Sequence, residues 1–134
     1  MHRTWLREHP AQLVQGPVTK RYVDHLLAAS ASDYGTLVAA VLPCFWLYAW
    51  VGAELSALAP VKDDHPYAAW LATYSDAEFF ASTALAIRYA EQAAAVAGPK
   101  SLESMRNAFF EASQHELDFF DAQRALLGSA LSAR

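Results

Sequence analysis

Cysteine is nearly absent from this chain, and basic runs are absent altogether. The 134 residues include one cysteine, Cys44, which excludes a disulfide within the chain and fits a reducing compartment such as the cytosol. The net charge of −4 comes from 14 acidic against 10 basic residues, with no basic block or stripe, so we expect no nucleic-acid interface. The stretch Met1–Pro10 lacks the apolar core of a signal peptide.

Charged residues of either sign are also scarce. They make up 18% of the chain against 54% hydrophobic residues, which predicts a helix buried on most sides or a large subunit interface. The run from Leu37 to Leu58 is apolar enough to raise the question of a membrane span. Pro43, Glu54 and the lack of flanking cationic anchors argue against one. We expect a soluble, cytoplasmic protein without membrane contact, built as a single domain over 1–134.

The period-two pattern of a half-buried strand occurs nowhere in the sequence, whereas helix boundaries are frequent. Ser32-Asp33 supplies an N-cap for a long central helix, and Ser75 with Glu78 forms a capping box for a later one. Gly98-Pro99 ends that later helix. The predicted fold class is all-α, with helices over about 1–9, 19–31, 34–58, 67–74, 75–97 and 101–127.

The stretch Leu42–Gly52 organises the central helix. It places Cys44 and Tyr48 one helical turn apart on one face. Pro43 removes a backbone donor just before the thiol, so we expect a kink there that exposes one side chain to a pocket. The alternative is a buried helix whose cysteine is an inert core residue.

Glu116 is a carboxylate on an otherwise apolar face of the last helix. Burial raises the pKa of such a group into the range useful for proton transfer, although a structural bridge from a Tyr or Arg of a neighbouring helix would also explain it. Several tyrosines, each unremarkable alone, could line a pocket with a flat face and one hydroxyl. They are Tyr22, Tyr48, Tyr67 and Tyr74. Together these groups suit covalent chemistry on a flat aromatic ligand.

The spacing of the histidines in the sequence does not support a metal site. His25 and His65 are candidates for metal or haem, but neither belongs to a His-x-x-x-His or Glu-x-x-His pair. Gly-rich phosphate loops, serine-elbow motifs and zinc spacings are missing as well. We therefore predict no metal and no cofactor.

Four stretches of the chain resemble the TenA family, the thiaminase II or aminopyrimidine aminohydrolase proteins. In chain order they are Tyr22–Leu26, Leu42–Tyr48 with Gly52, His65–Tyr74 and Ser113–Asp121. All four occur in the family's order and spacing, between about Tyr22 and Gln123. The second and third of these stretches are specific to the family.

The resemblance implies a haem-oxygenase-like helical bundle and hydrolysis of 4-amino-5-aminomethyl-2-methylpyrimidine in thiamin salvage, and it leaves open whether thiamin itself is also cleaved. Cys44 matches the family's nucleophile, and Glu116 matches its acid/base carboxylate. Tyr48 matches a tyrosine near the nucleophile, Tyr74 one that lines the pyrimidine pocket, and Tyr22 another pocket residue. The family needs no metal and usually forms homotetramers.

Some features depart from the family's pattern. His115 and Phe120 stand where the family usually has tyrosine and tryptophan, and Gln123 falls near another usual tyrosine. We expect the bundle to be N-terminally shortened, because the opening helices that carry an amine-recognising aspartate have no counterpart here. Two alternatives stay open. One is a non-catalytic protein that binds a pyrimidine or assembles with other chains, and the other is a haem-related domain that uses His25.

Overall fold

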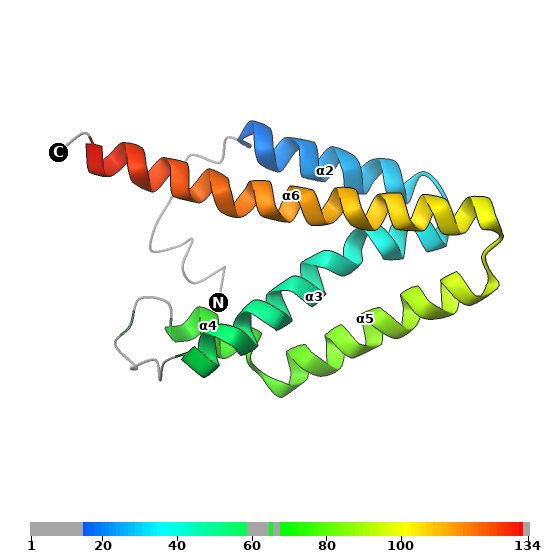
Figure 1. Ribbon diagram of the computed structural model, residues 1–134, viewed down its shortest axis with the longest axis horizontal. Helices are drawn as coiled ribbons and strands as arrows, with labels where there is room; N and C mark the ends of the chain where they lie inside the picture. Colours follow the sequence, from blue (N-terminus) through cyan, green and yellow to red (C-terminus); the bar gives the residue numbers. More distant parts are fainter. Residues whose placement is uncertain (1–14, 59–64, 66–67, 133–134) are drawn as a thin grey trace.

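The computed structural model describes residues 15–58, 65 and 68–132, with the backbone alone over 123–132. These residues form α2 (Pro17–Ser30), α3 (Tyr34–Leu58), α4 (Ala68–Tyr74), α5 (Ala77–Val96) and α6 (Pro99–Ser132), as Figure 1 shows. No strand occurs among them, which confirms the predicted all-α class. The helix expected over 1–9 lies outside the described residues.

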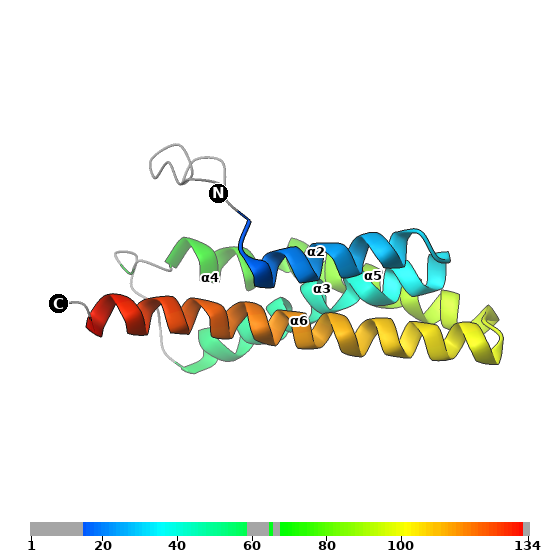
Figure 2. The same cartoon turned by 90° about the horizontal axis from the view of Figure 1, so that it is seen from above.

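The apolar helix α3 is the centre of the bundle. It contacts each of the other described helices, and α2 runs beside α6 in both views (Figures 1 and 2). By length and composition α3 is also the one described helix that could cross a membrane, a test that the core helix of a helical bundle passes as well. Its contacts with four helices account for part of its apolar composition, while Trp46 and Trp50 stay exposed, and the cytoplasmic location stays a prediction.

The start of α3 is capped as the sequence predicts. The backbone N–H of Thr36 donates to Asp33 Oδ1 at 2.9 Å, and its hydroxyl donates to Asp33 Oδ2 at 3.0 Å. These hydrogen bonds lower the pKa of the Asp33 carboxyl. The helix then continues without a break through Pro43, whose side chain is fully buried.

The capping box predicted at Ser75 is wrong. The N-cap of α5 is Asp76, and no side chain makes a capping hydrogen bond there. The Ser75 hydroxyl instead donates to the carbonyl of Leu71 at 2.7 Å, back into the last turn of α4. The last helix also begins earlier than predicted, because Pro99 fits the first position of a helix, and it continues to Ser132.

Small residues bring the helices that carry the site close together. Ala29 of α2, Ala40 of α3 and Ala108 of α6 form a buried cluster. At the other end of α3, Gly52 lies against the last turn of α4, where an added Cβ would be only 2.6 Å from the carbonyl oxygen of Tyr74. Gly52 thus lets Tyr74 approach the face of α3 that carries Tyr48.

Candidate functional site

A cavity of about 320 Å³ opens between α2, α3, α4 and α6. It is at the lower end of the size range of small-molecule sites, roughly 300–1,000 Å³. All five residues that the sequence singles out as site residues line this cavity. The lining consists of Thr19, Tyr22, Val23, Leu26, Cys44, Tyr48, Tyr74, Glu116 and Phe119.

Cys44 lies on α3, one turn before Tyr48, and it is exposed. Cys44 is therefore not a buried core residue, contrary to that part of the alternative, and its reactivity stays a prediction. Although the residue is exposed, the atoms of the cavity wall shield its sulfur from part of the surrounding water. This desolvation, together with the negative charge of Glu116, raises the pKa of the Cys44 thiol above its ordinary value. The resting group is therefore a thiol that must lose its proton before it can act as a nucleophile.

Glu116 reaches the cavity from α6 and is only 3% exposed. Its Oε1 accepts a hydrogen bond of 2.7 Å from the Tyr22 hydroxyl of α2. Burial raises the pKa of the Glu116 carboxyl, and hydrogen bonds from Tyr22 and Tyr48 oppose that rise. The tyrosine bridge that the sequence left open is thus present, and it holds the carboxylate at the cavity wall.

Tyr48 and Tyr74 form an aromatic wall on the α4 side of the cavity. Their ring centroids are 5.0 Å apart, and Tyr48 also lies 5.6 Å from the ring of Phe120. Burial raises the pKa of both hydroxyls, so they stay protonated and act as hydrogen-bond donors. A flat aromatic ligand could stack here while its polar edge faces hydroxyl, thiol and carboxylate. Tyr67, the remaining candidate tyrosine, lies outside the described residues.

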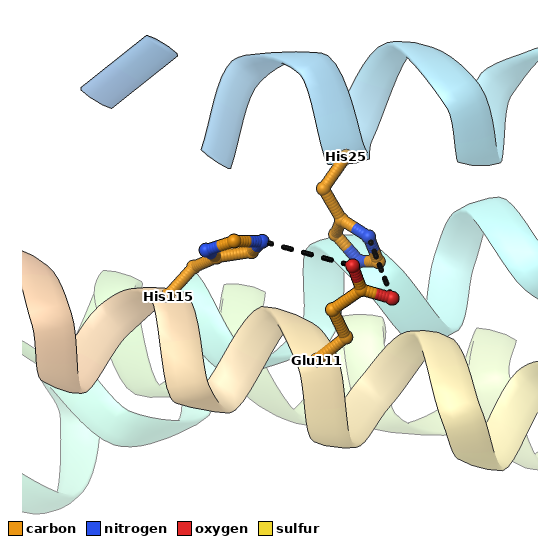
Figure 3. Close-up of side chains that lie close together, drawn as sticks. All are labelled: His25, Glu111 and His115. Atoms are coloured by element: carbon orange, nitrogen blue, oxygen red, sulfur yellow. Dashed lines mark ion pairs between the residues drawn. The ribbon is translucent and has the colours of Figure 1, made fainter. Parts of the chain in front are cut away.

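A second group of side chains lies beside this cavity, and of its members the sequence pointed only to His25. His25 of α2 and Glu111 and His115 of α6 bring one ligating atom each to within 4.8 Å of one another (Figure 3). The Glu111-x-x-x-His115 spacing, which places both side chains on one helix face, is the pattern that could have pointed to it. Its third member comes from a helix far away in sequence. One ring nitrogen of His25, Nε2, lies 3.1 Å from the carbonyl oxygen of Ala108, and the other, Nδ1, lies 3.4 Å from Glu111 Oε2.

The described helices thus form a bundle in which a thiol, a buried carboxylate and three tyrosines line one cavity. The chain belongs to the TENA/THI-4/PQQC family, whose model matches residues 7–126. This membership confirms the haem-oxygenase-like helical fold.

Three curated relatives resemble the chain. It is 42% identical over 125 residues to the thiamine biosynthesis multifunctional protein ThiED of Corynebacterium efficiens, a match that covers 90% of this chain and 17% of that protein. It is 30% identical over 105 residues to the aminopyrimidine aminohydrolase of Halalkalibacterium halodurans, covering 77% and 46%. It is 33% identical over 85 residues to the mitochondrial bifunctional TH2 protein of Arabidopsis thaliana, covering 63% and 14%. The chain thus spans less than half the length of each. No solved structure matches it significantly.

Proposed function

We propose that this chain carries the active site of an aminopyrimidine aminohydrolase and acts in thiamin salvage. The observation that carries the proposal is the convergence of Cys44, Glu116 and three tyrosines on one cavity. Its relatives support the substrate class, since one is named an aminopyrimidine aminohydrolase and another a thiamine biosynthesis protein. The reaction replaces the amine on the methylene carbon of the pyrimidine with the hydroxyl of water and releases ammonia.

Proton transfer to Glu116 starts the proposed reaction. The raised pKa of Glu116 makes its carboxylate a stronger base than usual, and the thiol of Cys44 has to lose a proton. As the sulfur forms a bond to a ring carbon, an electron pair moves onto a ring nitrogen. Glu116 then delivers the proton to that nitrogen. Each proton transfer moves the single negative charge between groups, so the cavity never holds two, and the negative charge of Glu116 is one reason why the pKa of Cys44 is raised.

Departure of the amine follows from the electron-rich adduct. The substrate amine enters as its ammonium form and leaves as ammonia when the ring electron pair forms an exocyclic C=C bond at the methylene carbon. Water then adds to that carbon and gives a proton to the Glu116 carboxylate. The thiolate leaves and takes up the ring-nitrogen proton, which restores the aromatic ring. The hydrogen bond from the Tyr22 hydroxyl keeps Glu116 pointed at the cavity.

Product formation tests the proposal. The protein is incubated with 4-amino-5-aminomethyl-2-methylpyrimidine and, separately, with thiamin, and the hydroxymethyl pyrimidine is measured by liquid chromatography. We expect product from the wild type and none from Cys44→Ala. Tyr48→Phe should be slowed, while Tyr34→Phe, which changes a tyrosine that is 61% exposed, should not. Binding of the pyrimidine without turnover would instead support a non-catalytic binding protein.

A further inference from the structure

We propose that His25, Glu111 and His115 form a binding site for a divalent transition-metal ion, with zinc as the expected occupant. The three side chains join two helices, α2 and α6, and Figure 3 shows the Glu111 carboxylate between the two imidazole rings. Two imidazoles and one carboxylate are a set that zinc uses at sites with three protein ligands. The proposal does not depend on the hydrolase activity.

A hydrogen bond to the backbone orients His25 for metal binding. Its Nε2 lies 3.1 Å from the carbonyl oxygen of Ala108. A carbonyl only accepts, so Nε2 carries the proton. In the neutral imidazole the lone pair is then on Nδ1, which faces Glu111 Oε2. Metal-bound histidines commonly donate their far ring N–H to a carbonyl in this way.

The distance between His25 and Glu111 fits an ion better than a shared proton. Nδ1 and Oε2 are 3.4 Å apart. A charge-assisted N–H···O hydrogen bond is shorter, about 2.7–2.9 Å. Zinc binds histidine nitrogen at about 2.0–2.1 Å and carboxylate oxygen at about 2.0–2.2 Å, so two such ligands on a tetrahedral ion lie about 3.4 Å apart. The observed separation matches one edge of that tetrahedron.

His115 completes the set from one turn further along α6. Its Nε2 is 4.0 Å from Glu111 Oε1, and its Nδ1 is buried without a hydrogen-bond partner in the described part of the chain. When Nε2 binds an ion, Nδ1 carries the ring proton. Glu111 is 63% exposed, so its side chain can adjust, and a fourth coordination position remains open to water.

The proposed ion lies beside the cavity rather than in it, since neither histidine is among the cavity's lining residues. Tyr22 connects the two places. Its ring stacks on His115 with centroids 5.5 Å apart, and its hydroxyl donates to Glu116. An ion bound at His115 would thus fasten α2 to α6 next to the hydrogen bond that positions Glu116.

Titration with zinc chloride tests the site, using folded protein without a polyhistidine tag. Isothermal titration calorimetry should show one zinc per chain. Glu111→Gln should weaken the affinity at least about tenfold, as loss of a ligand or its support does. The matched control, Glu91→Gln, changes an exposed carboxylate of α5 and should leave the affinity unchanged. A double change of His2 and His9 to Asn should also leave it unchanged.

Two further measurements keep the proposal refutable. Cobalt(II) bound in place of zinc should give visible d–d absorption bands that disappear in Glu111→Gln. Zinc should raise the melting temperature of the wild type but not of Glu111→Gln, because an ion that binds only the folded state stabilises it. Failure of the wild type to bind zinc, or equal affinity in Glu111→Gln, would overturn the proposal and leave only polar contacts between the histidines and Glu111.

Discussion

Replacing Gly52 with alanine should change the shape of the cavity, although Gly52 does not line it, because Gly52 packs against Tyr74, which does. Gly52 is buried in α3, and a Cβ at this position would lie 2.6 Å from the carbonyl oxygen of Tyr74 and 2.8 Å from its carbonyl carbon. These are backbone atoms, so no flexible side chain can swing away. The added methyl group must therefore push α4 away from α3.

The size of the effect follows from that geometry. The Cβ and the carbonyl oxygen must separate by 0.4 Å to reach 3.0 Å, and by 0.8 Å to reach an ordinary contact of 3.4 Å. Overpacking of this kind costs about 1–3 kcal/mol of the free energy of unfolding. In a chain of this size the melting temperature falls by roughly 4 °C for each kcal/mol.

Displacement of Tyr74 should also affect catalysis. Its ring contacts Tyr48 and lines the cavity, so a shift of several tenths of an ångström changes the pocket proposed for the pyrimidine. Misplacement by about 1 Å can cost about 100-fold in rate. We expect kcat/KM for Gly52→Ala to fall by between about 10-fold and about 100-fold.

Urea denaturation and steady-state hydrolysis measure the two effects, with Gly98→Ala as the matched control. Gly98 has no atom within 4 Å of an added Cβ, and its substitution should change stability by no more than about 0.5 kcal/mol. Gly52→Ala with the stability and KM of the wild type would refute the close packing of α3 on α4 and its role in placing Tyr74.

Other predictions concern the charged groups and the surface. Tyr22→Phe removes a hydrogen bond to a buried carboxylate and should cost about 1.5–3 kcal/mol in urea denaturation, whereas Tyr34→Phe should cost almost nothing. Iodoacetamide should alkylate Cys44 with a midpoint above pH 9.0, its ordinary pKa, because burial and the Glu116 charge disfavour the thiolate; a midpoint below pH 8 would contradict this. Glu116→Gln should lower that midpoint. Analytical ultracentrifugation should show a homo-oligomer, expected as a tetramer, because apolar side chains such as Trp50 of α3 are 60% exposed; a monomer at high concentration would contradict it.

Local sequence determined the helices and the identity of the reactive groups. The range of α3 agrees with the prediction, and Asp33 caps it, because capping and helical periodicity depend on residues only a few positions apart. The prediction from local sequence was wrong at Ser75. Its hydroxyl was expected to bond the backbone of Glu78 and instead donates to the carbonyl of Leu71, four residues earlier. Local patterns could not choose between them.

Only the tertiary structure decided which groups meet. Tyr22 and Glu116 are 94 positions apart, and their hydrogen bond exists because the alanines of α2, α3 and α6 let these helices pack closely. The same packing left Cys44 exposed at a cavity and placed His25 against Glu111, neither of which a spacing rule can show. Long-range contacts depend on how whole helix faces fit together, and that fit is a property of the folded chain.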